Sequence, residues 1–276
     1  APGHRDPAQA LSAAHHVMLS HGMALEEIRR QVSGCRAGIV LNLVPVHAAS
    51  ESEEDLDAAR WFDGIINRWY CDPIFKGSYP EDTIEDRVSR GHLPAAGLPF
   101  LKGGDLDIIS VPIDFLGLNY YTRVIMKSRP DGGPVEVKGA PGEDLTDMGW
   151  EVYPEGLYEL LKRLSDDYGP EKIYITENGA AFPDEPDSTG RIRDLRRIDY
   201  IRGHLEAACR ALNDGVKLGG YFAWSLMDNF EWAHGYTKRF GLYRVDFGSM
   251  ERSPRDSAYY YRDIIASKAV IPFDRR

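Results

Sequence analysis

The apolar residues of this chain follow two patterns. In five stretches they recur every three or four positions, which is the spacing of amphipathic helices. These stretches cover about residues 7–30, 53–70, 154–168, 198–212 and 256–267. Four short, unbroken apolar runs lie between them, and they predict strands that are buried on both faces. The runs begin near residues 38, 114, 172 and 219.

Local signals place the ends of the elements. Asp6 and Pro7 are suited to begin the first helix, and Pro154 to begin the third. The helix over residues 53–70 is expected to bury one face made of Leu56, Ala59, Phe62, Ile66 and Trp69. Residues 71–112, rich in Pro and Gly, and the polar stretch 127–146 are predicted to be irregular.

Strand followed by helix, four times over, predicts parallel βαβ units and an α/β fold. A closed parallel barrel needs eight such units. The pattern therefore leaves two architectures open: an open, doubly wound sheet, or half of a larger barrel. In either case residues 1–276 are expected to form one domain, with no second domain.

Composition excludes several classes of partner. A formal net charge of −10 argues against nucleic acid and anionic membranes, and no apolar run approaches the ~20 residues of a membrane span. Cys35, Cys71 and Cys209 are widely spaced, so we expect small buried hydrophobic residues rather than disulfides. His15, His16 and His21 lack metal-site spacing and are expected to be partly buried or exposed, and no cofactor-binding motif appears.

The chain begins with Ala1 and a loop. We expect an element to precede this loop, so the true start, and with it any signal peptide, lies outside the sequence. The expected location is cytoplasmic.

Glu177 is the first candidate for chemistry. It ends the apolar run over residues 172–176 and is followed by Asn178 and Gly179. Ligands and catalytic groups gather at the carboxyl ends of parallel strands. A solvated Glu that opens an Asn-Gly turn is an equally good interpretation of this segment alone.

The last strand leads into a second candidate segment, which contains Trp224, Glu231 and Trp232. Flat aromatic surfaces and carboxylates together suit the C–H faces and hydroxyl rim of a sugar. A core position is the better interpretation of Trp224 by itself. It is a weaker one for Glu231 and Trp232, which are expected on a loop.

Seven motifs, in order, resemble family 1 of the glycoside hydrolases, the β-glucosidase family. They are HRDP at 4–7, GIVLN at 38–42, DFLGLNYY at 114–121, ITENG at 175–179, GYFAWSLMDNFEW at 220–232, RFGLY at 239–243 and VDF at 245–247. The resemblance implies a (β/α)8 TIM barrel of which this chain supplies strands five to eight, the C-terminal half.

The resemblance also implies a retaining β-glycosidase that acts on terminal, unphosphorylated β-glycosides or small oligosaccharides. Glu177 would be the nucleophile, with Tyr121 orienting it. The implied substrate-binding residues are Asn119, Trp224, Glu231, Trp232 and Phe240. A carboxylate at Glu231 would repel the phosphate of a 6-phosphoglycoside.

Retaining hydrolysis needs a second carboxyl group as acid/base. In the family this Glu lies in a Thr-Asn-Glu-Pro type motif, which this chain lacks. Glu51, Glu53 and Glu54 follow a predicted strand, but they are typical of an acidic first helical turn. We therefore expect the isolated chain to be inactive, and to associate with the missing N-terminal half or with itself through exposed sheet edges.

Two other functions remain open from the sequence. A sugar-binding module would bind glucosides without turnover. A dimeric half-barrel would close eight strands from two copies and place two Glu177 residues in one barrel.

Overall fold

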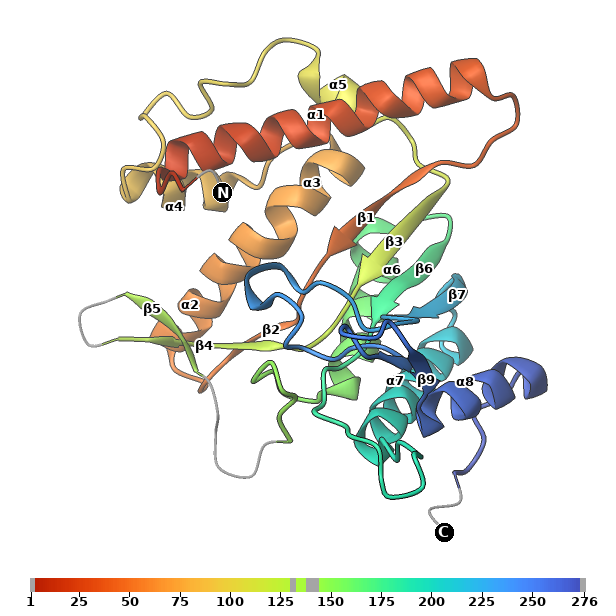
Figure 1. The fold of residues 1–276 in the computed structure, drawn as a ribbon. Helices are drawn as coiled ribbons and strands as arrows, with labels where there is room; N and C mark the ends of the chain where they lie inside the picture. Colours follow the sequence, from red (N-terminus) through yellow and green to blue (C-terminus); the bar gives the residue numbers. More distant parts are fainter. Residues whose placement is uncertain (1–2, 130–132, 138–143, 274–276) are drawn as a thin grey trace. The chain divides into compact units, whose positions relative to one another are not determined.

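The computed structural model describes residues 3–129, 133–137 and 144–273. The chain divides into two compact units (Figure 1). The first unit comprises Ala1–Gly117, Val124–Val137 and Leu164–Lys172, and the second comprises Leu118–Arg123, Lys138–Arg163 and Ile173–Arg276. Strand β3 (Phe115–Asn119) and helix α6 (Pro154–Tyr168) each contribute residues to both units.

The first unit is mainly helical. Its elements are α1 (Pro7–Gln31), β1 (Gly38–Asn42), β2 (Val46–Ala48), α2 (Glu53–Asp63), the π-helical segment η1 (Gly64–Arg68), α3 (Trp69–Lys76), α4 (Glu81–Ser89), α5 (Asp105–Ile109), β4 (Val124–Ser128) and β5 (Pro134–Val137). Strand β1 is the neighbour of β3. A separate small sheet pairs β2 with β4 in parallel and β4 with β5 antiparallel.

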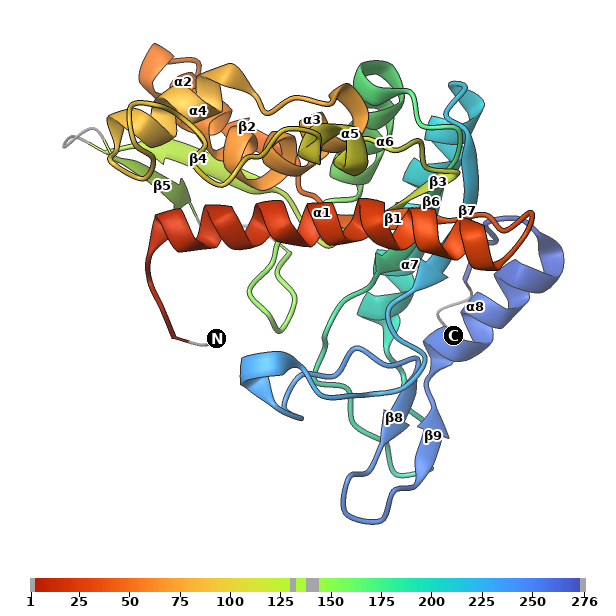
Figure 2. The same cartoon turned by 90° about the horizontal axis from the view of Figure 1, so that it is seen from above.

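Helix α1 begins where the sequence predicts. The Asp6 side chain accepts hydrogen bonds from the backbone N–H groups of Ala8 and Gln9, which caps the helix. Its buried face packs against α5, beside which it lies in Figures 1 and 2. Gly22 is required at this contact, because a Cβ there would lie 1.9 Å from the carbonyl oxygen of Ile108.

The predicted helix over residues 53–70 is interrupted. The π-helical segment η1 separates α2 from α3, and an extra residue in a turn rotates the faces on either side of it relative to each other. Ala59 and Trp69 are buried as predicted, whereas the prediction was wrong for Leu56, which is 48% exposed.

Both segments predicted to be irregular contain regular structure. The C-terminal part of α3, together with α4 and α5, lies within residues 71–112, and the end of β4 and all of β5 lie within residues 127–146. Residues 130–132 and 138–143 of the latter segment lie outside the described residues. These elements are only four to nine residues long, so their apolar periods are too short to stand out among Pro, Gly and polar residues.

The second unit contains the strands that carry the candidate site. Its elements are β6 (Ile173–Asn178), α7 (Leu195–Asn213), β7 (Leu218–Ala223), the 3₁₀ turn η2 (Trp232–His234), β8 (Tyr243–Val245), β9 (Arg252–Pro254) and α8 (Asp256–Ser267). Strands β3, β6 and β7 are neighbours in that order, and β6 and β7 are parallel. Helices α7 and α8 pack together through a core that includes Ile201, Leu205 and Ile264.

The prediction of strands buried on both faces holds for the middle of β3 but not for β1 and β7. Val40 of β1 is 48% exposed and Phe222 of β7 is 57% exposed. Unbroken apolar character reports that a strand is apolar on both faces, and does not establish that each face is covered.

Two smaller predictions need correction. None of the three cysteines forms a disulfide, as expected, and Cys71 is buried, but Cys35 is only partly buried and Cys209 is exposed. His15 is fully buried, with Nδ1 2.9 Å from the Tyr79 hydroxyl and Nε2 3.1 Å from an Asp105 carboxylate oxygen. These two polar partners are what allow a ring with two nitrogens to be buried on the apolar face of α1. None of the helices in the described ranges is both long and apolar enough to cross a membrane.

Candidate active site

Glu177 lies one residue before the end of β6 and is partly buried. Its carbonyl oxygen accepts a hydrogen bond of 2.9 Å from the backbone N–H of Tyr120, which follows β3. On the other side, the pairing of β6 with β7 shifts register between Ile175 and Asn178. The carboxylate therefore projects from a strand whose backbone is held firmly on one side and is irregular on the other.

Tyr121 contacts this carboxylate directly. Its hydroxyl donates a hydrogen bond of 2.5 Å to Oε2 of Glu177. Burial, and then the hydrogen bond to Glu177 and its charge, raise the pKa of Tyr121 well above the ordinary value of a phenol. Tyr121 therefore stays a proton donor across the physiological range, and Oε1 of Glu177 is left for other interactions.

Asn119 is the last residue of β3 and belongs to the same site. Its Oδ1 accepts a hydrogen bond of 2.7 Å from the hydroxyl of Thr176, the neighbour of Glu177. Because this bond occupies Oδ1, the amide group has a fixed orientation, with its N–H donors left for a ligand.

Three aromatic rings line one side of the site. The Tyr121 ring lies 5.4 Å from Trp150 and 6.2 Å from Phe240, measured between ring centroids, and the latter two are 6.2 Å apart. Phe240 is 3% exposed, and its place in the wall of a ligand site stays a prediction. Trp150 was missed by the sequence reasoning, because it follows a polar stretch with no periodic pattern to mark it.

Trp224 directly follows β7, and its side chain is partly buried. Its backbone N–H donates to the carbonyl of Asn178 at 2.9 Å. Gly179 passes so close to this segment that a Cβ would lie 1.8 Å from the Trp224 carbonyl oxygen. The Gly of the predicted motif therefore serves close approach between the segments that follow β6 and β7.

Glu231 and Trp232 lie at the start of η2, on the loop where the sequence places them. Trp232 is 83% exposed and has a positive φ of 39°. Glu231 is partly buried, and no hydrogen bond joins its carboxylate to another described residue. Burial raises the pKa of Glu231, and the nearby charge of Glu177 raises it further, although His234 acts in the opposite direction.

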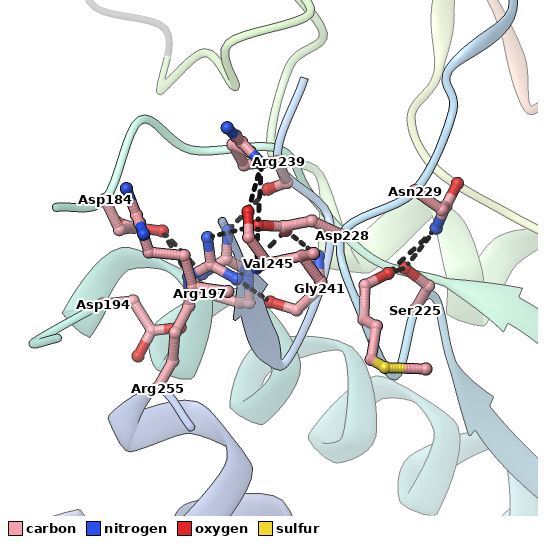
Figure 3. Close-up of polar contacts among 12 residues, drawn as sticks. Asp184, Asp194, Arg197, Ser225, Asp228, Asn229, Arg239, Gly241, Val245 and Arg255 are labelled. Atoms are coloured by element: carbon pink, nitrogen blue, oxygen red, sulfur yellow. Dashed lines mark hydrogen bonds and ion pairs between the residues drawn. The ribbon is translucent and has the colours of Figure 1, made fainter. Parts of the chain in front are cut away.

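A buried ion cluster is centred on Asp228, three residues before Glu231 in the same loop. Figure 3 shows the residues of this cluster. Asp228 accepts hydrogen bonds from the backbone N–H groups of Gly241 and Val245 and from both terminal nitrogens of Arg255, the latter at 3.1 Å. Asp228 and Arg255 are both buried. The Asp228 carboxylate therefore holds the segments that contain Gly241, Val245 and Arg255 together through hydrogen bonds.

Arg197 extends the cluster toward the segment that follows β6. Its Nη1 donates to the carboxylates of Asp184 and Asp194, each at 2.6 Å, and its Nη2 donates to the carbonyl of Arg239 at 2.8 Å. Arg239 directly precedes Phe240, so Arg197 links the aromatic wall to the segment after Glu177. The sequence reasoning missed this cluster, because isolated charges in loops carry no spacing signal.

His204 of α7 gives the second unit a specific pH dependence. It is fully buried, its Nδ1–H donates to the Tyr200 carbonyl at 2.7 Å, and burial lowers the pKa of His204 to about 4. The unfolded chain binds a proton below about pH 6.5, whereas the folded chain does so only below about pH 4. Burial of the neutral ring therefore does not lower the free energy of unfolding above about pH 6.5. As the pH falls from 6.5 toward 4, protonation of His204 in the unfolded chain lowers the free energy of unfolding.

We expect the free energy of unfolding to fall by about 3 kcal/mol more in the parent chain than in His204→Asn between pH 7 and pH 4. Urea denaturation across this range measures the difference, in which other titrating groups cancel. Parallel pH profiles for the two chains would show that His204 is not buried as a neutral group.

Within the described residues, no cluster of three or more His, Cys, Asp and Glu side chains is arranged to hold a metal ion. The candidate site therefore consists of a carboxylate with a phenol donor, an amide, a second carboxylate and several aromatic surfaces.

Known proteins are similar to this chain in sequence. Residues 1–270 match the family described as glycosyl hydrolase family 1. Beta-glucosidase A of Acetivibrio thermocellus is 44% identical over 271 residues, which are 96% of this chain and 59% of that protein. A 6-phospho-beta-galactosidase of Clostridium acetobutylicum is 35% identical over 97% of this chain and 61% of its own length.

The fold is shared as well. The structure of a beta-glucosidase from Thermotoga maritima in complex with glucoimidazole matches with a TM-score of 0.90 and 41% identity, over 98% of this chain and 59% of that one. The predicted α/β class and barrel family are thereby confirmed. The chain spans about three fifths of the length of these relatives and which barrel strands it supplies stays a prediction.

Proposed function

The chain belongs to glycosyl hydrolase family 1, and from that premise we propose that it carries the nucleophile half of a retaining β-glycosidase. Its substrates are terminal, unphosphorylated β-glucosides or related small oligosaccharides. The hydrogen bond of 2.5 Å between Tyr121 and Oε2 of Glu177 is the observation that carries this proposal. It presents an oriented carboxylate at the end of a parallel strand, where α/β enzymes place catalytic groups.

In the proposed reaction, Oε1 of Glu177 attacks the anomeric carbon while the bond to the leaving group breaks. Tyr121 holds Oε2 and thereby fixes the direction of attack. The departing oxygen takes a proton from an acid/base carboxyl, and a water deprotonated by the same group then displaces Glu177 from the anomeric carbon. Two displacements give net retention of configuration.

The other residues of the site suit a glycone. Trp224 provides a flat apolar surface for the C–H faces of the ring, and Trp232 provides a second on the loop. Phe240 is buried and supports the ring of Tyr121 from behind. Glu231 has a carboxylate without a hydrogen-bond partner among the described residues and can accept bonds from sugar hydroxyls. Asn119 offers its amide N–H groups.

Glu231 also favours an unphosphorylated sugar. Its carboxylate and that of Glu177 lie close enough for their charges to interact. A phosphate group would add further negative charge beside this pair, which is unfavourable in a partly buried site. Aryl 6-phosphoglycosides are therefore expected to be poor substrates, although one relative is named a 6-phospho-beta-galactosidase.

We propose that the acid/base carboxyl comes from a separate segment, corresponding to the N-terminal part of the family. Glu53 and Glu54 do not fill this role, because they form the first turn of α2 behind the Ser52 cap. An apolar groove of about 390 Å³ beside β7, lined by Phe222, Leu226 and Ile265, offers a surface for such a segment to cover.

The test is the hydrolysis of an aryl β-glucoside by the chain alone and by the chain mixed with a separately prepared N-terminal segment of a family 1 enzyme. We expect little or no turnover from the chain alone and measurable turnover on mixing. Turnover by the chain alone would contradict the proposed origin of the acid/base group. It would point to Glu231, whose pKa is raised as in a general acid.

A further inference from the structure

Behind Glu177 lies a layer of buried hydrogen bonds centred on Asn178. This side chain is fully buried, and its Nδ2 donates to the Tyr120 carbonyl at 2.8 Å and to the Tyr200 hydroxyl at 3.1 Å. Its Oδ1 accepts from the Tyr221 hydroxyl at 2.7 Å. Both amide N–H groups and the amide oxygen therefore have partners, so the amide has one defined orientation.

Tyr200, from α7, connects this layer to both partners of the Tyr121–Glu177 pair. Its hydroxyl donates to the backbone carbonyl of Tyr121 at 3.1 Å. The same oxygen accepts a hydrogen bond of 3.1 Å from Nδ2 of Asn178, the residue after Glu177. One hydroxyl thus links the backbone that carries the phenol donor to the side chain that directly follows the carboxylate.

The position of this hydroxyl is itself fixed. The Tyr200 ring is 1% exposed and packs with Ala180 and Phe182. It stacks on His204 with ring centroids 3.9 Å apart and planes inclined by 29°. His204 in turn bonds the Tyr200 carbonyl. Tight packing leaves the ring one rotamer and places its oxygen to within a fraction of an ångström.

We infer that Tyr200 is a positioning residue, which sets the distance between the Tyr121 hydroxyl and Glu177. A hydrogen bond of 2.5 Å between side chains from two different segments, one at the end of β6 and one just after β3, requires both backbones to be held within a few tenths of an ångström. Loss of the Tyr200 hydroxyl would leave the Tyr121 carbonyl and one N–H of the Asn178 amide without this partner. The consequence of Tyr200 for catalysis rests on the proposed function, but its effect on the hydrogen bond does not.

The test compares Tyr200→Phe with the matched control Tyr260→Phe. Tyr260 is also buried and donates its hydroxyl to a backbone carbonyl, that of Ile271. Among the described residues, no hydrogen bond joins it to Glu177, Tyr121 or Asn178. The readout is the proton NMR signal of the Tyr121 hydroxyl, assigned by its loss in Tyr121→Phe. Its exchange with water reports how often the bond to Glu177 opens.

We expect exchange to be at least about fivefold faster in Tyr200→Phe and unchanged in Tyr260→Phe. Equal exchange in Tyr200→Phe and the parent chain would overturn the inference. If Tyr200→Phe does not fold, Tyr221→Phe takes its place, because it frees Oδ1 of Asn178. A smaller acceleration of the exchange is then expected. If exchange in Tyr221→Phe is no faster than in the parent chain, the inference is likewise overturned.

A second readout separates this inference from the proposed function. In the presence of the N-terminal segment, a 2-fluoro glucoside with an activated leaving group should label Glu177 in the parent chain. Tyr200→Phe should lower the maximal labelling rate by a larger factor than it changes the concentration that gives half the maximal rate. Failure to label the parent contradicts the proposed nucleophile, while the NMR comparison still decides the role of Tyr200. Equal labelling of both chains contradicts the role of Tyr200 alone.

Discussion

Replacement of Glu177 by Ala should lower the rate of aryl β-glucoside hydrolysis by a factor on the order of 10⁴–10⁶, measured in the mixture with the N-terminal segment. In the proposed mechanism, the carboxylate that Tyr121 orients is the group that forms the covalent intermediate. Without it, no group of the site can attack the anomeric carbon from the face opposite the leaving group.

Added azide should restore part of this activity on a substrate with a good leaving group. A small anion can occupy the space left by the carboxylate and attack the anomeric carbon once, so the product is an α-glycosyl azide of inverted configuration. Glu185→Ala is the matched control, because Glu185 is an exposed carboxylate paired with Arg244. A loss of activity in Glu185→Ala similar to that in Glu177→Ala, or no effect of azide, would contradict the assignment.

Replacement of Asp228 by Asn should lower the free energy of unfolding by about 3–5 kcal/mol. The change keeps the shape of the side chain but removes the negative charge opposite Arg255, which is completely buried. The buried guanidinium would keep only the more distant carboxylate of Asp184, 3.7 Å from its Nε, and this partial loss of compensation is costly in the interior. The backbone N–H groups of Gly241 and Val245 also lose a charged acceptor.

Urea denaturation measures this effect, with Asp199→Asn as its control. Asp199 pairs with Arg202 one helical turn away, and both side chains are more than one third exposed. Such a surface pair contributes at most about 1 kcal/mol. If the free energy of unfolding falls by a similar amount in both variants, the cluster around Asp228 does not hold the surrounding loops in place.

The sequence predicts the long elements of this chain well, for identifiable reasons. Helices α1, α6, α7 and α8 each contain three or more turns, so their apolar period is repeated often enough to be recognised. The start of α1 at Pro7 follows from the capping chemistry of Asp6, which acts within three residues. The short helices α4 and α5 and the hairpin of β4 and β5 are stabilised mainly by packing with the rest of the chain, which no local pattern reports.

The candidate site divides in the same way. Glu177, Tyr121 and Phe240 belong to motifs with a characteristic order of residues, and in the structure Tyr121 contacts the side chains of both Glu177 and Phe240. Their roles in the site stay predictions. Trp150, Tyr200 and Arg197 lie in segments without a recognisable motif. Their roles depend on contacts with residues that are far away in the sequence, so three-dimensional structure is needed to find them.

The most direct test of the central claim is the mass of the chain after incubation with 2-deoxy-2-fluoro-β-glucosyl fluoride. Fluoride departs without protonation, so the acid/base group is not needed for the first displacement, and the 2-fluoro group slows the second. We predict that the chain gains one fluoroglucosyl group, located on the peptide that contains Glu177. Two results would contradict the assignment of Glu177 as the nucleophile. One is a chain that stays unlabelled even in the presence of the N-terminal segment, and the other is a label on another carboxylate.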